Sequence, residues 1–96
     1  MDFYGAVTAG HEVKVRQLLD QGVDINAGGE FGPALYAAIA HGHTHIVELL
    51  LEKGADVNAQ GIRFKTALQA AVFRGNTEIV QLLLEKGADI NIQLLS

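Results

Sequence analysis

The strongest candidates for site chemistry in this sequence are three histidines, His41, His43 and His45, which lie within five residues. Imidazole nitrogens are common ligands of zinc and nickel. His41 comes just before Gly42, and His45 falls at the start of a predicted helix, so the three rings need not converge on one ion. We therefore expect structural or solvent-facing roles for these histidines, with no metal site and no cofactor.

Residues able to form a catalytic site are scarce. The sequence has no Cys and a single Ser, Ser96, so a pair of nucleophile and base has only threonines left to draw on. Asp24, Asp56 and Asp89 recur once per copy of a repeated segment, which indicates a role in a turn. The glycines follow predicted helices rather than preceding them, so they match no phosphate-binding loop. We expect a protein that is not an enzyme.

Composition and charge narrow the classes of partner. The 96 residues suit one domain and carry a net charge of −4, with seven Lys and Arg scattered along the chain. Because no basic stripe is present, we expect no nucleic acid partner. No apolar run approaches the length of a membrane span, and residues 1–4 do not resemble a secretion signal. Together with the absence of Cys, this favours an intracellular protein, in the cytoplasm rather than the nucleus.

An internal repeat organises the chain. Residues 46–58 and 79–91 differ at two positions only, and they are offset by 33 residues. Residues 15–26 form a more diverged copy with an offset of 32, and the missing residue falls in a predicted loop. Repeats of this length build solenoids, in which each copy buries its apolar face against its neighbours. The predicted single domain 1–96 consists of repeat 1 (1–27), repeat 2 (28–60), repeat 3 (61–93) and a tail (94–96).

Each copy predicts two helices that are joined by a tight turn and followed by a loop. The first helix ends at Gly42 or Gly75, and a glycine past a helix can adopt the left-handed conformation that closes it. The second helix carries an apolar stripe too wide for one buried face, as a helix between two neighbours requires. Thr44 and Thr77 are its expected N-caps. In repeats 2 and 3 the predicted helices span 34–41, 44–53, 67–74 and 77–86.

The repeated segments resemble the ankyrin repeat, whose core reads T-P-L-H-x-A-A-x-x-G-H-x-x-I-V-x-L-L-L-x-x-G-A-D-V-N. Residues 33–38 read P-A-L-Y-A-A, and residues 66–71 read T-A-L-Q-A-A. The resemblance implies an all-α ankyrin solenoid of three stacked helix-turn-helix repeats with projecting β-turn loops. The A-L-Q-A-A form is similar to repeats of fungal multi-repeat ankyrin signalling proteins. Tyr4, Tyr36 and Gln69 replace the family's His, so we expect its backbone hydrogen-bond network to be altered.

The resemblance also implies a protein partner, which is bound through the turns and first helices on the concave surface. Positions there that packing leaves free differ between the copies, and Arg together with aromatic residues is typical of interfaces. For Phe31 and Phe64, which recur at equivalent places, packing under their own turn is the alternative. The rival interpretation is a structural segment of a longer solenoid, or a designed or reconstructed array, with no partner of its own. The expected partner-binding residues are Glu30, Phe31, His41, Arg63, Phe64, Lys65, Phe73 and Arg74.

The two ends of the array differ in sequence. Where repeat 2 has Ile46 and Leu49, repeat 1 has Lys14 and Gln17, whose polar side chains suit an N-terminal cap. Repeat 3 has no polar substitution at these places. We expect residues 92–96 to fold back and cover part of the apolar surface there with Leu94 and Leu95, and a second copy of the chain to cover the rest. A weak homodimer through repeat 3 is therefore expected.

Overall fold

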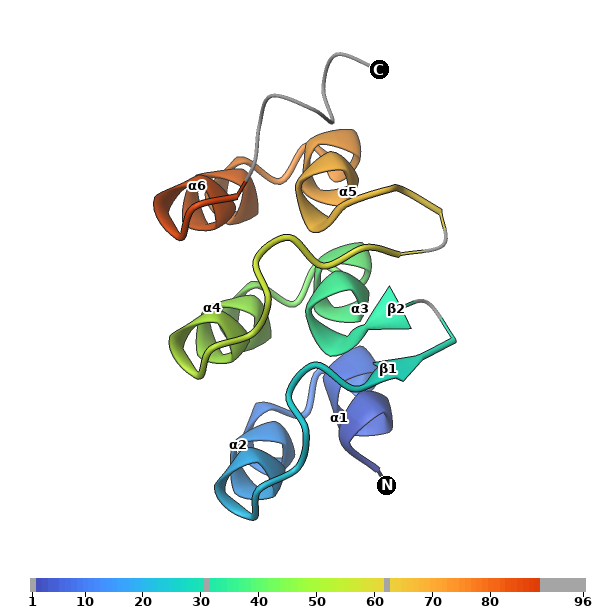
Figure 1. The fold of residues 1–96 in the computed structure, drawn as a ribbon, viewed down its shortest axis with the longest axis vertical. Coiled ribbons are helices and arrows are strands. Elements are labelled where there is room, and N and C mark those ends of the chain that lie inside the picture. The colour runs from blue at the N-terminus through green and yellow to red at the C-terminus, as the bar shows by residue number, and fades with distance from the viewer. Residues whose placement is uncertain (1, 31, 62, 89–96) are drawn as a thin grey trace.

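The computed structural model describes residues 2–30, 32–61 and 63–88. Within these residues six helices form three pairs that stack in chain order, so α1, α3 and α5 make one layer and α2, α4 and α6 make the other (Figure 1). The expected all-α solenoid of three stacked repeats is confirmed. No helix in the described part of the chain is long and apolar enough to cross a membrane. The helices are α1 (Phe3–Ala9), α2 (Glu12–Asp20), α3 (Ala34–Ala40), α4 (Thr44–Glu52), α5 (Ala67–Arg74) and α6 (Thr77–Glu85).

The N-caps of the second helices lie one residue earlier than the sequence predicted. Thr44 and Thr77 are the first helical residues, and His43 and Asn76 are the residues that precede them. Asn76 Oδ1 accepts a hydrogen bond from the backbone N of Ile79 at 3.1 Å, so asparagine performs the capping that we assigned to threonine. His43 occupies the N-cap position of α4 without a side-chain capping bond, and its ring bonds instead to the backbone O of Thr8 in α1.

The core lies between the two layers and runs through all three pairs. Residues 34–39 of α3 are all buried, since α1 and α5 pack against this helix from the neighbouring repeats. Ile46 and Leu49 of α4 are each 2% exposed, whereas Lys14 of α2 is half-buried and Gln17 is exposed. This is the contrast in exposure that we expected between the first repeat and the second. Because fully burying one aliphatic side chain contributes ~1.5–3 kcal/mol, the stacking of repeats stabilises the fold.

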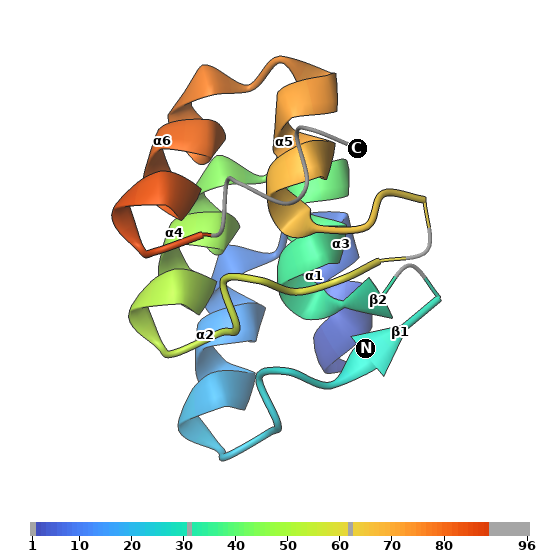
Figure 2. The ribbon, with the colours of Figure 1, turned by 45° about the horizontal axis from the view of Figure 1, so that its top comes forward.

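The loops between the pairs are held by their own polar residues. Asp24 Oδ1 accepts a hydrogen bond from the backbone N of Asn26 at 3.0 Å, and Asp56 makes the same bond one repeat later. Asn26 Oδ1 accepts from the backbone N of Asp56 at 3.0 Å, so successive turns are tied together. In the first loop the short strands β1 (Gly28–Gly29) and β2 (Gly32–Pro33) pair antiparallel. Both loops project to the same side, beyond the layer of first helices (Figure 2).

Candidate functional site

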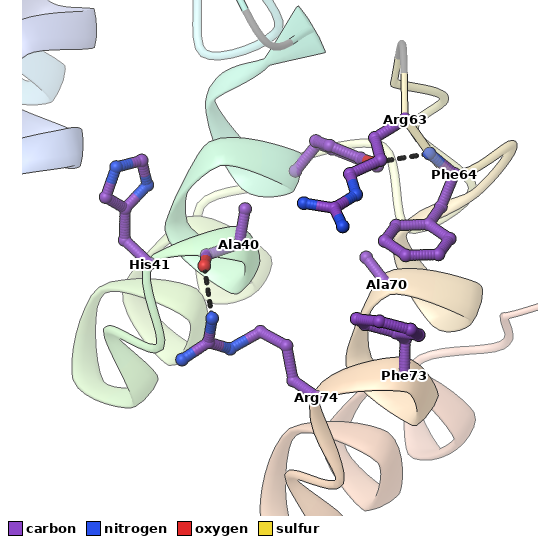
Figure 3. A pocket seen from close by; sticks show the side chains of 8 residues that line it. Ala40, His41, Arg63, Phe64, Ala70, Phe73 and Arg74 are labelled. Carbon is purple, nitrogen blue, oxygen red and sulfur yellow. Dashed lines mark hydrogen bonds between the residues drawn. The ribbon is translucent and has the colours of Figure 1, made fainter.

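A hollow in the surface collects residues from two adjacent repeats. It lies between α3, α5 and the loop that precedes α5, and its volume is about 250 Å³. Because α3 and α5 are neighbours in the first layer, residues at their C-terminal ends face the same space as this loop (Figure 3). We call this hollow the α3–α5 pocket. Its lining residues are Tyr36, Ala40, His41, Arg63, Phe64, Ala70, Phe73 and Arg74.

Two aromatic rings form one wall of the α3–α5 pocket. The ring centroids of Phe64 and Phe73 are 4.8 Å apart, and the ring planes are inclined by 38°, which is within the range of favourable aromatic pairs. Cζ of Arg63 lies 5.6 Å from each centroid, at cation–π distance. Phe64 is half-buried and packs against the core, whereas Phe73 is 65% exposed. The wall therefore presents apolar surface to solvent with a guanidinium group at its edge.

Tyr36 holds the loop of the pocket in place. Its hydroxyl accepts a hydrogen bond from the backbone N of Phe64 at 2.7 Å. Its buried ring lies against Gly61, so closely that a Cβ at this glycine would overlap the ring carbons. Tyr4 stands in the same relation to Gly29. In repeat 2 the residue that replaces the family's His therefore bonds to the loop of the next repeat.

The equivalent residue of repeat 3, Gln69, bonds within its own repeat instead. Its Oε1 accepts a hydrogen bond from the backbone N of Lys65 at 2.9 Å, and its backbone N donates to Thr66 Oγ1 at 3.2 Å. This reciprocal arrangement resembles a capping box at the start of α5. It fixes the direction in which the loop enters α5, and so helps to place Arg63 and Phe64 over the pocket.

Arg74 connects repeat 3 to repeat 2. Its Nη1 donates a hydrogen bond to the backbone O of Ala40 at 2.7 Å. His43 makes the equivalent connection one repeat earlier, with Nε2 at 2.9 Å from the backbone O of Thr8. The glycine of the turn leaves room for such a side chain, since a Cβ at Gly42 would lie 3.0 Å from Arg74 Nη2. Arg74 therefore has a structural bond in addition to its place in the pocket.

Each of the three clustered histidines has a polar partner of its own. His41 Nδ1 lies 2.9 Å from the backbone O of Ala37, and the rings of His41 and His43 are stacked with centroids 6.0 Å apart. His45 is directed toward Glu48, with Nδ1 3.8 Å from Oε1. Across residues 2–30, 32–61 and 63–88, no group of three or more His, Cys, Asp or Glu is placed to hold a metal ion. The local contacts account for the positions of these rings.

The α3–α5 pocket brings together five of the eight residues expected to bind a partner. Glu30 and Lys65 are exposed on adjacent loops outside its lining, and Phe31 lies outside the described residues. Sequence analysis missed Tyr36 and Ala70, because their positions match those of buried helix residues. The signal for Tyr36 was its replacement of the family's His. The five residues in the lining are His41, Arg63, Phe64, Phe73 and Arg74.

Stacked helix pairs with loops that project past one layer, and a pocket formed across two pairs, define a helical repeat protein. The family model of the ankyrin repeats matches residues 3–93 with three copies. The chain belongs to the ankyrin repeat family. A search of curated proteins found no match for this sequence.

Proposed function

We propose that this chain is a protein–protein interaction module, which binds a protein partner through its loops and first helices with the α3–α5 pocket at the centre. Ankyrin repeats generally serve as protein interaction modules, and domains built from them are typically non-catalytic. On this proposal the protein is not an enzyme and binds neither a cofactor nor nucleic acid. The cytoplasmic location expected from the sequence stays a prediction, which fluorescence microscopy of the tagged protein tests.

The observation that carries this proposal is the exposed ring of Phe73. The same place in the first helix holds Thr8 in repeat 1 and Ala40 in repeat 2, so repeat packing does not require an aromatic residue there. Phe73 is nevertheless 65% exposed, beside Arg63, which takes the place of Glu30 in repeat 2. Phe and Arg are both enriched in the cores of protein interfaces, and Arg is enriched among binding hot spots.

Affinity capture tests this proposal with variants that leave the fold intact. The immobilised chain is incubated with a cell extract, and retained proteins are quantified by mass spectrometry. Phe73→Ala places in repeat 3 the residue that repeat 2 already has, and Arg63→Glu reverses a charge in the pocket. We expect each variant to reduce partner retention about tenfold or more, as truncation of a hot spot does. Lys53→Glu, at the exposed end of α4, is the control for net charge and should retain the partner.

The choice of Arg63 over Arg74 follows from the contacts. Reversing the charge of Arg74 would also break its hydrogen bond to the backbone O of Ala40, so a loss of binding there would have two causes. The contrary result is that the wild type retains no protein more strongly than Phe73→Ala and Arg63→Glu do. The rival interpretation, a structural segment or array without a partner of its own, then replaces this proposal.

A weak homodimer is our second proposal, and it concerns the outer face of repeat 3. Val72 and Leu84 are 44% and 40% exposed, whereas the equivalent Ile39 and Leu51 of repeat 2 are 0% and 7% exposed. Residues 92–96, which we expected to cover part of this face, lie outside the described residues. Sedimentation velocity should show association that increases with concentration and is reduced by Leu84→Glu. A strict monomer at hundreds of micromolar would contradict the dimer.

A further inference from the structure

The α3–α5 pocket is positively charged in a chain that is acidic overall. Its lining contains the guanidinium groups of Arg63 and Arg74 and no carboxylate, although the net charge of the chain is −4. Two further charged residues on the loops, Glu30 and Lys65, lie outside the lining. A field of one sign is stronger in a hollow with low-dielectric walls than on an open surface. The pocket therefore favours a negatively charged group.

Arg63 has donors available for such a group. Among the described residues it makes no hydrogen bond or ion pair, and its contacts are those with the Phe64 and Phe73 rings. Figure 3 shows its guanidinium directed away from the loop, into the space between Ala40 and the two rings. A guanidinium carries five N–H donors in a planar fork that matches the two oxygens of a carboxylate. Arg74 donates Nη1 to the backbone O of Ala40, and its Nη2 lies beside Gly42, so Arg74 adds positive charge to the lining while Arg63 supplies the donors.

The apolar wall restricts the ligand further. A lone carboxylate would pair with Arg63 and leave the exposed ring of Phe73 in water, whereas a large apolar group next to the carboxylate would cover that ring as well. The volume of about 250 Å³ is below the range of ~300–1,000 Å³ that is typical of pockets for small-molecule ligands. One or two side chains of a peptide suit this space better than a free metabolite does.

We propose that the α3–α5 pocket recognises a segment of a partner protein in which an Asp or Glu stands next to a large aliphatic or aromatic residue. The carboxylate of that segment pairs with the Arg63 guanidinium, and the charge of Arg74 in the same lining adds to the attraction. The neighbouring apolar side chain packs on the Phe64–Phe73 wall. This inference rests on the function proposed above and adds the chemistry of the partner to it.

Selection from a displayed library of random peptides tests the inference. The peptides are fused to the carrier at their C-termini, so that all their carboxylates come from side chains. Selection against the folded wild-type chain, with counter-selection against Phe73→Ala, isolates sequences that need the pocket. We expect enrichment of Asp or Glu adjacent to Leu, Ile, Phe or Tyr. Synthetic versions of the enriched peptides, with amidated C-termini, are then titrated by fluorescence polarisation.

Three variants separate the contributions to binding. Arg63→Gln should lower the affinity for the acidic peptides about tenfold or more, because it removes a charge-assisted hydrogen bond. Arg63→Lys keeps the positive charge but lacks the planar guanidinium, so its affinity for the acidic peptides should lie between those of the wild type and Arg63→Gln. Lys53→Gln changes the net charge equally but lies outside the pocket, and it should leave affinity unchanged. Unfolding curves that coincide with the wild type establish that each variant is folded.

The outcomes distinguish this inference from the proposed function. The partner chemistry is overturned if the enriched peptides depend on Phe73 but are neutral or basic. It is also overturned if they bind Arg63→Gln with the same affinity as the wild type. In both cases the proposal of an interaction module is unaffected. Peptides that bind tightly only with a free C-terminal acid also overturn it, since the carboxylate would then be terminal. If no peptide binds the wild type better than it binds Phe73→Ala, the pocket is not a binding site. That result contradicts both proposals.

Discussion

The close contact between Tyr36 and Gly61 allows the effect of a Gly61→Ala substitution to be predicted from the structure. A Cβ built on Gly61 would lie 2.5 Å from Cδ2 of the Tyr36 ring and closer still to Cε2 and Cζ. Carbon atoms in favourable contact are ~3.5–4.0 Å apart, so the methyl group would overlap the ring by about 1 Å. The ring cannot move aside, because Tyr36 is 2% exposed and its hydroxyl accepts from the backbone N of Phe64. Gly61→Ala therefore forces the loop off the ring.

The expected loss of stability has two parts. Overpacking a filled site costs ~1–3 kcal/mol, whereas an unhindered Gly→Ala substitution stabilises a protein by ~0.4–1 kcal/mol through the unfolded state. Gly28→Ala is the matched control, because it lies in the preceding loop, where the nearest atom is 3.6 Å from its Cβ. Neither glycine has a positive φ, so neither substitution strains the backbone. We expect Gly61→Ala to lower the free energy of unfolding by a net ~0.5–2.5 kcal/mol and Gly28→Ala to leave it unchanged or higher.

A double-mutant cycle isolates the contact. Tyr36→Ala removes the ring and costs ~3–5 kcal/mol by itself, out of roughly 5–15 kcal/mol for a domain of this size. In that background Gly61→Ala should become neutral or stabilising. Urea denaturation followed by far-UV circular dichroism measures all four free energies. An equal loss with and without the ring would refute the steric explanation.

A second cycle keeps the test decisive if Tyr36→Ala does not fold. Tyr4 and Gly29 repeat the contact in the first loop, where the Cβ of Gly29 would lie 2.6 Å from the Tyr4 ring. Tyr4 is half-buried, so its loss should be tolerated. Because a half-buried ring can yield, we expect the same sign of coupling with a smaller magnitude.

Two further predictions concern the corrected cap and the tie between repeats 1 and 2. Asn76→Ala should lower the free energy of unfolding by about 1 kcal/mol, because α6 loses its N-cap, whereas Thr77→Ala should change it by less than ~0.5 kcal/mol. Equal losses in urea denaturation would restore threonine as the cap. His43→Ala removes the hydrogen bond to the backbone O of Thr8 and should cost ~0.5–1.5 kcal/mol, with faster amide hydrogen exchange in α1. His45→Ala, whose side chain is 85% exposed, should leave this exchange unchanged.

Much of the fold could be predicted from the sequence because the sequence repeats. The nearly identical segments 46–58 and 79–91 place the same helix and turn at the same register, and each needs a neighbour to cover its wide apolar stripe. Gly42 and Gly75 marked the ends of first helices, and both have left-handed φ values. The cap residue of α6 was misplaced because Asn76 and Thr77 are both polar and adjacent. Side-chain direction, which sequence does not display, decides which of two such residues performs the capping.

The candidate site was predicted in part, for a related reason. Residues that differ between the copies, such as Arg63 and Phe73, stood out because packing does not require them. Their grouping with His41 depends on how α3 and α5 stack, which the period of the repeat already implied. Lys65 was placed with them on the same argument, yet it lies outside the lining. A loop residue's direction depends on the path of its backbone, which Gln69 sets through a hydrogen bond.

The sequence by itself determined the architecture of this protein. The repeat period, the positions of the glycines and the apolar stripes can all be read along the chain, and all of them agree with stacked helix pairs. Tertiary structure alone decided how adjacent repeats are joined. Tyr36 reaches the loop of the next repeat, and Arg74 reaches back to the end of α3. These bonds join residues that are 28 and 34 positions apart, and each forms only where stacking brings a side chain and an unpaired backbone group together. The shape of the α3–α5 pocket follows from those joints.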